Sequence, residues 1–186
     1  AIAHKIAGPS ILARWAPGAL KEGLDGNSAE GSIQFAYDLA NYRSEFVRED
    51  GPIVTGFWRG VGATRNLLVL ETFIDELAIR AGQDPLNYRL ALLTRNDRAR
   101  QVVMRAAELA SWHEPLPPGR GRGIALLYAW GTYMAQVVDL TVGELGDISV
   151  QRVVCVVDCG VVVNPDTVIA QMQGGINFAL SAALFG

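Results

Sequence analysis

The segment Gly56-Phe57-Trp58-Arg59-Gly60-Val61-Gly62 places an arginine and two aromatic side chains among three glycines. Glycine permits positive φ angles and lets the backbone approach a ligand closely. A helical pattern follows at once, and the N-terminus of a helix favours anionic groups. The segment therefore predicts a loop that binds an anion or a cofactor, and a tight connection before a helix is the alternative.

A second motif lies near the end of the sequence. The apolar run from Val153 to Val157 is typical of a strand, and Asp158-Cys159-Gly160 follows it. Asn164-Pro165 then leads into a helical pattern that carries Gln171 and the pair Gly174-Gly175 near its start. The order is a strand, a turn and a helix whose first turns hold an amide and two glycines.

Together the two motifs resemble the molybdenum-binding large subunit of the xanthine oxidase and aldehyde oxidase family, and most closely the isoquinoline 1-oxidoreductase beta chains within it. In that family a loop of the type Phe-Trp-Arg-Gly-Val-Gly precedes a long helix. A strand ending in Asp-x-Gly then leads through Asn-Pro to a helix start of the type Gln-x-x-Gly-Gly. The resemblance extends to Glu30-Gly31, Asn41 to Val47, Asp75 to Ala78, Gly82 and Asp84-Pro85.

This resemblance implies hydroxylation of an electron-poor carbon, in a nitrogen heterocycle or an aldehyde, with oxygen from water. The cofactor carries the chemistry, and the protein supplies position and hydrogen bonds. The resemblance directs the backbone N–H groups of Arg59, Gly60 and Val61 at the molybdenum ligands. It assigns Gln171 to the dithiolene end of the pterin, where an amide can both donate and accept. Gly174 and Gly175 would let their helix pack against the cofactor or its neighbour.

The residues themselves leave plainer alternatives open. Arg59 could form an ion pair with a local carboxylate such as Glu71, and Gln171 could be an ordinary exposed helix residue. Phe57 and Trp58 could line a substrate funnel by stacking on an aromatic heterocycle, or could belong to the core.

The resemblance also implies several components outside this sequence. The general-base glutamate of the family belongs to a later loop, beyond residue 186, so no residue here is assigned a catalytic role and none is assigned as a metal ligand. The expected cofactor is molybdopterin with molybdenum, in the cytosine dinucleotide form. An iron–sulfur small subunit and the remainder of the large subunit are the expected partners, and the chain alone is expected to be inactive.

Composition sets further bounds. Half of the 186 residues are apolar, 19% are charged and the net charge is −3, which argues against disorder and against a nucleic-acid surface. The run from Ile176 to Gly186 is shorter than the roughly 18 residues of a membrane span, so no transmembrane segment is expected. Both ends are interpreted as cuts in a longer protein, which leaves a cytoplasmic or a periplasmic location open. Cys155 and Cys159 lie about 13 Å apart on a strand and are expected to be buried and reduced.

The predicted fold class is α+β, with mixed sheets and packed helices. Residues 1–118 are expected to hold strands, the glycine-rich loop and a three-helix group, and residues 119–186 to hold strands and a final helix. Lys21 to Gly31 is expected to be a surface loop. The expected strands are 4–8, 41–48, 53–57, 124–131, 133–142 and 149–157, and the expected helices are 10–16, 65–81, 85–93, 97–112 and 165–185.

A noncatalytic interaction or assembly domain is the competing hypothesis. In that case the glycine-rich loops are only tight turns, and the apolar strands join the sheet of a partner. The position of Arg59 relative to Gln171 separates the two hypotheses, because the enzyme hypothesis requires both residues to approach one cleft.

Overall fold

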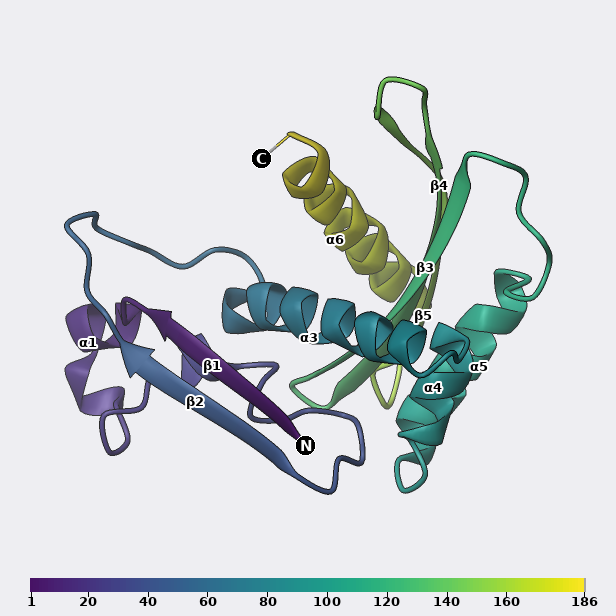
Figure 1. The fold of residues 1–186 in the computed structure, drawn as a ribbon. Helices are drawn as coiled ribbons and strands as arrows, with labels where there is room; N and C mark the ends of the chain where they lie inside the picture. Colours follow the sequence, from purple (N-terminus) through teal and green to yellow (C-terminus); the bar gives the residue numbers. More distant parts are fainter. Residues whose placement is uncertain (186) are drawn as a thin grey trace.

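The computed structural model describes residues 1–185 and shows an α+β fold with two separate sheets, as predicted (Figure 1). One sheet is a parallel pair of strands and the other is an antiparallel set of three. The strands are β1 (Ile2–Gly8), β2 (Tyr42–Arg48), β3 (Arg120–Ala129), β4 (Thr132–Val142) and β5 (Ile148–Asp158). The helices are α1 (Ile11–Trp15), the 3-10 turn η1 (Pro17–Ala19), α2 (Gly26–Ala29), α3 (Val61–Arg80), α4 (Pro85–Ala91), α5 (Asp97–Leu109) and α6 (Pro165–Phe185).

The first sheet pairs β1 with β2 in parallel, with Ile2 opposite Tyr42. Parallel strands need a long crossover, which residues 9–41 provide and which includes α1 and α2. The segment Lys21 to Gly31 was predicted as a surface loop, and this was wrong for its second half. Asp25 there is fully buried and caps α2 by accepting a hydrogen bond from the Ser28 N–H.

The predicted strand over residues 53–57 is absent from the described chain. This segment has no regular structure, and Ile53 and Val54 are about four-fifths exposed. Their β-branched side chains favour a strand, but strand propensity takes effect only where a neighbouring strand and a packing surface exist. The segment is therefore an exposed connection between β2 and α3.

Helices α3 to α5 follow the predicted spacing with shifted ends. α3 begins at Val61, four residues before the predicted start at residue 65, and Gly60 is its N-cap. α4 begins as predicted, with Asp84 accepting a hydrogen bond from the Asn87 N–H and with Pro85 in the first turn. α5 ends at Leu109, before the predicted Trp112.

The second sheet has the order β3-β4-β5. β3 begins at Arg120, four residues before the predicted start at residue 124. Trp130 and Gly131 join β3 to β4 with positive φ at both positions, as a two-residue hairpin turn requires. α5 packs on this sheet, and the core gathers apolar residues from both halves of the chain, on either side of residue 118. Its fully buried members include Ile74, Leu93, Val103, Ala106, Ala110 and Ala135.

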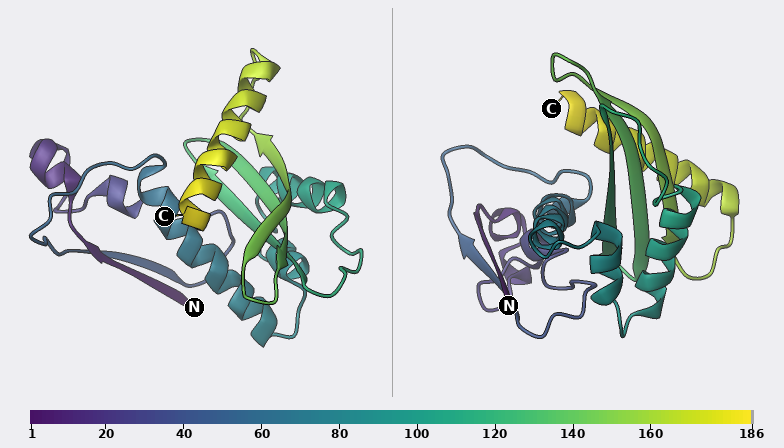
Figure 2. Two further views of the ribbon diagram at one scale, coloured as in Figure 1. Left: turned by 90° about the horizontal axis from the view of Figure 1, so that it is seen from above. Right: turned by 45° about the vertical axis from the view of Figure 1, so that its right-hand side comes forward.

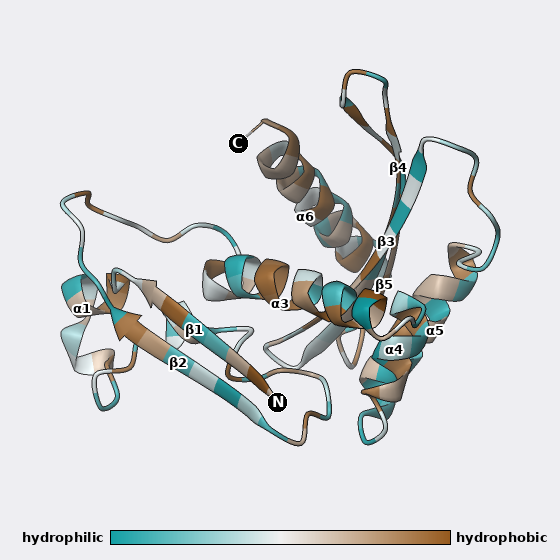
Figure 3. Ribbon diagram, viewed as in Figure 1, coloured by the Kyte–Doolittle hydropathy of each residue, from teal (hydrophilic) through white to brown (hydrophobic). Residues whose placement is uncertain are grey.

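The last helix, α6, leaves the sheet after β5 and extends away from α4 and α5 (Figures 1 and 2). It is apolar over much of its surface, yet none of its residues is buried (Figure 3). Its length and composition also suit a membrane span, so the length argument made from the sequence does not hold. A single helix of this kind is weak evidence for a membrane protein. Within the described residues, α6 exposes a large apolar surface.

Candidate functional site

The glycine-rich loop forms a tight turn directly before α3. The N–H of Val61 donates to the carbonyl oxygen of Trp58 at 2.9 Å, and Gly60 adopts φ 86° and ψ −3°. These angles are those of the third residue in a type II turn, where glycine is favoured. A Cβ at Gly60 would also lie 2.1 Å from the Thr64 hydroxyl oxygen. The backbone angles therefore favour glycine at position 60, and a larger residue there would also displace the Thr64 hydroxyl.

The turn determines which backbone N–H groups are free to donate to a ligand. Of the three N–H groups predicted to face a cofactor, that of Val61 closes the turn. The N–H groups of Arg59 and Gly60 make no hydrogen bond within residues 1–185. They precede the first turn of α3, whose N–H groups have no partner earlier in the helix. The turn and the helix start thus offer several backbone donors together.

The start of α3 is fixed to the α2 segment by close contact and hydrogen bonds. A Cβ at Gly62 would lie 2.1 Å from the carbonyl oxygen of Asn27, so only glycine fits there. The buried amide of Asn66 donates to the carbonyl oxygens of Ser28 at 2.9 Å and Glu30 at 2.7 Å. The helix that carries the loop therefore has a rigid base.

Phe57 and Trp58 line a pocket of 290 Å³ beside this base. Their side chains are 43% and 59% exposed, so the alternative that they belong to the core is wrong. Phe57 packs edge-on against Trp15, with ring centroids 5.6 Å apart. The pocket also reaches Val61 and Arg65, so aromatic and cationic side chains meet at its edge. This arrangement suits a flat ligand, and a substrate-lining role for Phe57 and Trp58 stays a prediction.

The predicted residues of α6 lie on an open face of that helix. Gln171 is exposed, and a Cβ at Gly174 or Gly175 would meet no atom within 4 Å. Phe178, two turns beyond Gln171, packs against the loop before α3, with its ring centroid 5.3 Å from that of Trp58. The structure thus brings α6 to the Arg59 loop.

The alternative pairing of Arg59 with Glu71 is wrong. Glu71 faces the interior, where its Oε2 accepts from the Nε of Arg89 at 3.1 Å, the Tyr37 hydroxyl at 3.2 Å and the Leu126 N–H at 2.9 Å. Arg89 is fully buried and also pairs with Asp75. Burial raises the pKa of the Glu71 carboxyl, and the Arg89 charge only partly offsets this. This network joins α3, α4 and β3.

Sequence reasoning missed this network because buried and exposed charges look alike in a helical pattern. The one available signal was position: Glu71 lies next to the apolar stripe through Leu70 and Ile74. Arg59, by contrast, is exposed and has no carboxylate within ion-pair distance in the described chain.

Asp158, at the end of β5, has a structural partner. Arg98 of α5 donates to both of its carboxylate oxygens, at 2.7 and 2.8 Å. The nearby Cys155 and Cys159 are free, as predicted, and both are half-buried rather than buried. In residues 1–185 no three His, Cys, Asp or Glu side chains gather as metal ligands.

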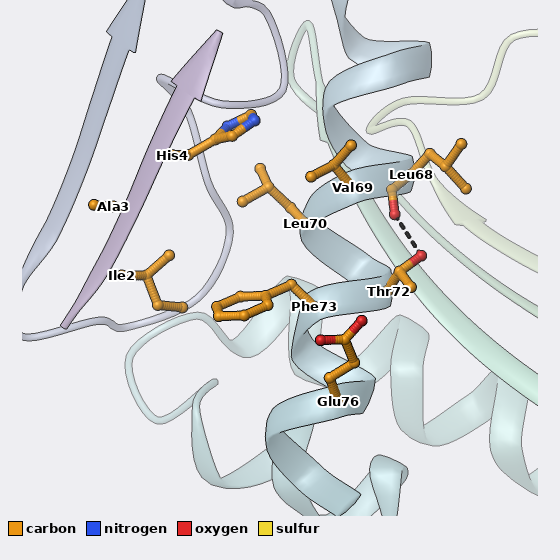
Figure 4. Close-up of a pocket in the computed structure, with 9 residues that line it drawn as sticks. All are labelled: Ile2, Ala3, His4, Leu68, Val69, Leu70, Thr72, Phe73 and Glu76. Carbon is orange, nitrogen blue, oxygen red and sulfur yellow. Dashed lines mark hydrogen bonds between the residues drawn. The ribbon is translucent and has the colours of Figure 1, made fainter. Parts of the chain in front are cut away.

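Other hollows lie away from the predicted residues. A groove of 410 Å³ runs between β1 and α3 and is lined largely by apolar side chains such as Ile2, Leu68 and Phe73 (Figure 4). His4 and Glu76 are at its edge. A wider hollow of 620 Å³ lies between α4 and α5. Neither contains Arg59 or Gln171.

Comparison with known families identifies the class of protein. The family model described as "Molybdopterin cofactor-binding domain" matches residues 91–185, about half of the chain. The chain therefore belongs to this family, and the resemblance drawn from the two motifs is confirmed. The matched range includes α6 with Gln171 and Gly174, while the Arg59 loop precedes it. No solved structure matches the chain.

Three curated relatives are similar to the chain. The beta subunit of the isoquinoline 1-oxidoreductase of Brevundimonas diminuta is 35% identical over 99% of the chain and 24% of the relative. A subunit of the nicotinate dehydrogenase of Pseudomonas putida is 35% identical over 80% of the chain and 14% of the relative. The membrane-bound aldehyde dehydrogenase [pyrroloquinoline-quinone] of Gluconacetobacter polyoxogenes is 30% identical over 89% and 25%. The chain spans a quarter or less of the length of these relatives.

Proposed function

We propose that this chain supplies part of the molybdenum site of a hydroxylase that oxidises a nitrogen heterocycle or an aldehyde, with oxygen taken from water. Family membership supports the cofactor class, and the names of the relatives support the substrate classes. The single observation that carries the proposal is the contact between α6 and the Arg59 loop, because it places the helix that carries Gln171 beside that loop. An interaction domain would not require that contact.

The residues present suit a molybdopterin cofactor. The turn before α3 offers the free N–H groups of Arg59 and Gly60, and the exposed Arg59 guanidinium adds a positive charge. Gln171 offers an amide that donates and accepts, and Gly174 leaves its side of α6 open. When bound, the cofactor would supply the redox chemistry, and these residues would hold and orient it.

The finer points of the proposal follow the family resemblance. The cofactor is proposed to be the cytosine dinucleotide form of molybdopterin, and electrons are proposed to pass to iron–sulfur clusters on a separate small subunit. The remainder of the large subunit is proposed to supply the general base. The exposed apolar surface of α6 supports a further covering segment, since large apolar patches mark contact surfaces.

The first test is elemental analysis of the full-length subunit that carries this chain, purified with its copurifying partners from molybdate-fed cells. About one molybdenum per subunit, with iron in a smaller partner, is the expected result. A well-folded preparation without molybdenum would contradict the proposal and favour the interaction-domain hypothesis.

Two pairs of variants then test the residues. Arg59→Pro removes the N–H while fitting the second position of the type II turn, whereas Arg59→Ala removes only the side chain. The proline variant is expected to lose more molybdenum than the alanine variant. Gln171→Ala is expected to lose activity, and Gln173→Ala, two residues along and on another face of α6, is expected to retain it. Equal molybdenum and activity in all four variants would exclude these contacts.

A further inference from the structure

Phe178 is the residue through which α6 contacts the Arg59 loop. Its ring centroid lies 5.3 Å from that of Trp58, at an interplanar angle of 43°. The Cζ atom of Arg59 lies over the same ring, 5.5 Å from its centroid. Aromatic pairs and cations at these separations attract one another. One phenylalanine therefore contacts two consecutive residues of the loop.

The position of Phe178 on α6 determines which face of the helix points toward the loop. Residues three and seven positions apart lie on one face of a helix, so Gln171, Gly174 and Phe178 share a face. The contact at Phe178 turns that face toward the loop. Gly174 has no atom within 4 Å of where its Cβ would lie, so this face carries no other packing at that point.

The segments on both sides of the contact are otherwise weakly held. No residue of α6 is buried, and the loop follows an exposed, irregular connection from residue 49 onward. Phe178 itself is 37% exposed, so it packs at a surface rather than in the core. The loop is otherwise held on the side of α1 and α3, by the packing of Phe57 on Trp15 and by its own turn, and none of these contacts reaches α6. The Phe178 contact therefore has a large effect on the position of α6 relative to the loop.

We propose that Phe178 is a positioning residue that sets the distance and orientation between the Arg59 loop and the Gln171 face of α6. This inference rests on the proposed function, in that both segments then contact one cofactor. Phe178 acts through Trp58 and Arg59 and does not itself touch the reacting atoms.

The test compares three variants of the full-length subunit. Phe178→Leu keeps an apolar side chain but removes the ring, Phe178→Tyr keeps the ring, and Phe185→Leu is the matched control. Phe185 belongs to the same helix and is 87% exposed. The aromatic and cation–π contacts together correspond to a factor of about ten in an equilibrium constant.

The first readout is trypsin cleavage after Arg59, measured on cofactor-free subunit, because a cofactor bound at the N–H groups of Arg59 and Gly60 would itself protect this bond. Phe178→Leu is expected to raise the cleavage rate about tenfold, because cleavage follows the population of the open loop. Phe178→Tyr and Phe185→Leu are expected to match the wild type. An unchanged rate in Phe178→Leu would overturn the inference whether or not the protein holds molybdenum.

The second readout is the electron paramagnetic resonance signal of Mo(V), together with kcat. Phe178→Leu is expected to change the signal and lower kcat while the molybdenum content stays the same, and Phe178→Tyr is expected to restore both. Trp58→Leu breaks the same contact from the loop side, so it replaces Phe178→Leu in the trypsin and Mo(V) measurements if that variant does not fold. Its kcat is not compared, because Trp58 is also a predicted substrate-lining residue. An unchanged signal in a variant whose loop has opened would overturn the positioning role. A wild type without molybdenum would instead refute the proposed function.

Discussion

The packed block of this protein, formed by α3, α4, α5, β3 and β4, differs sharply from its two site segments, residues 53–60 and α6. The packed block holds fully buried residues such as Ile74, Val103 and Ala106, and encloses the pair of Glu71 and Arg89. The site segments hold no buried residue and expose Ile53, Trp58 and Ile169. The block therefore supplies the fixed frame, and the site segments supply the groups available to a ligand or a covering partner.

The two motifs are thus not stabilised by their own packing. The loop is held by the attachment of α3 to the α2 segment at Gly62 and Asn66 and by the packing of Phe57 on Trp15, and α6 contacts the loop through Phe178. A surface that a folded chain leaves apolar and open is typical of a contact surface. This agrees with relatives at least four times as long as the aligned part of the chain.

The largest expected difference between the packed block and the site segments is in the free energy of unfolding, and Arg89→Met in the packed block tests it. This change leaves the buried Glu71 carboxylate without its charged partner, which is expected to lower the free energy of unfolding by about 3–5 kcal/mol. Arg59→Met, in a site segment, is expected to change it by less than about 0.5 kcal/mol. Urea unfolding followed by circular dichroism measures both values. The double variant Glu71→Gln with Arg89→Met is expected to regain part of the loss, and a loss below about 1 kcal/mol in Arg89→Met would contradict this account.

A second, smaller test compares two glycines. Gly62→Ala forces a Cβ against the carbonyl oxygen of Asn27 and is expected to lower the free energy of unfolding by about 1–3 kcal/mol. Gly174→Ala meets no atom within 4 Å and is expected to stabilise α6 by up to about 1 kcal/mol, since alanine favours helix.

At position 174, the effect on molybdenum content is expected to be opposite to the effect on stability. The stabilised Gly174→Ala subunit is expected to contain less molybdenum, because its new methyl group lies on the face shared with Gln171. Full molybdenum content in this variant would show that the open face of α6 does not contact the cofactor. A destabilised Gly174→Ala would instead show that the helix is packed more closely than the structure indicates.

Local signals in the sequence predicted the elements that local chemistry determines. Asp84 and Pro85 mark the start of α4 by capping and by proline geometry, and the antiparallel strands follow their β-branched runs. Ile53 and Val54 carry the same strand preference, but no strand lies beside them, so the prediction there was wrong.

The parts of the site that sequence could not predict depend on contacts between distant segments. The partner of Glu71 is Arg89, from another helix, and spacing along the chain does not reveal this. Asp25 appeared to belong to a polar surface loop, yet it is buried because Ser10 and Ser28 hydrogen-bond its carboxylate. Phe178 was one apolar residue in a helical pattern, and only the fold shows that it contacts Trp58 and Arg59.

The smallest effect on stability is expected from a change at Asp158, which lies where the packed block meets the connection to α6. Hydrogen bonds from Arg98, then from the Gly160 N–H, lower the pKa of the Asp158 carboxyl from 3.8 to about 2. A carboxyl whose folded pKa is lowered contributes stability above its ordinary pKa and loses that contribution as the pH falls through the folded value. The wild type should therefore exceed Asp158→Asn in urea midpoint by a constant amount at about pH 5 to 7, and the difference should shrink between about pH 4 and pH 2.

Glu144→Gln, in an exposed turn, controls for the loss of one negative charge. A difference that persists undiminished at about pH 2 would show that Asp158 does more than pair with Arg98, and no difference at about pH 6 would show that the pair of Arg98 and Asp158 does not stabilise the packing of α5 on β5.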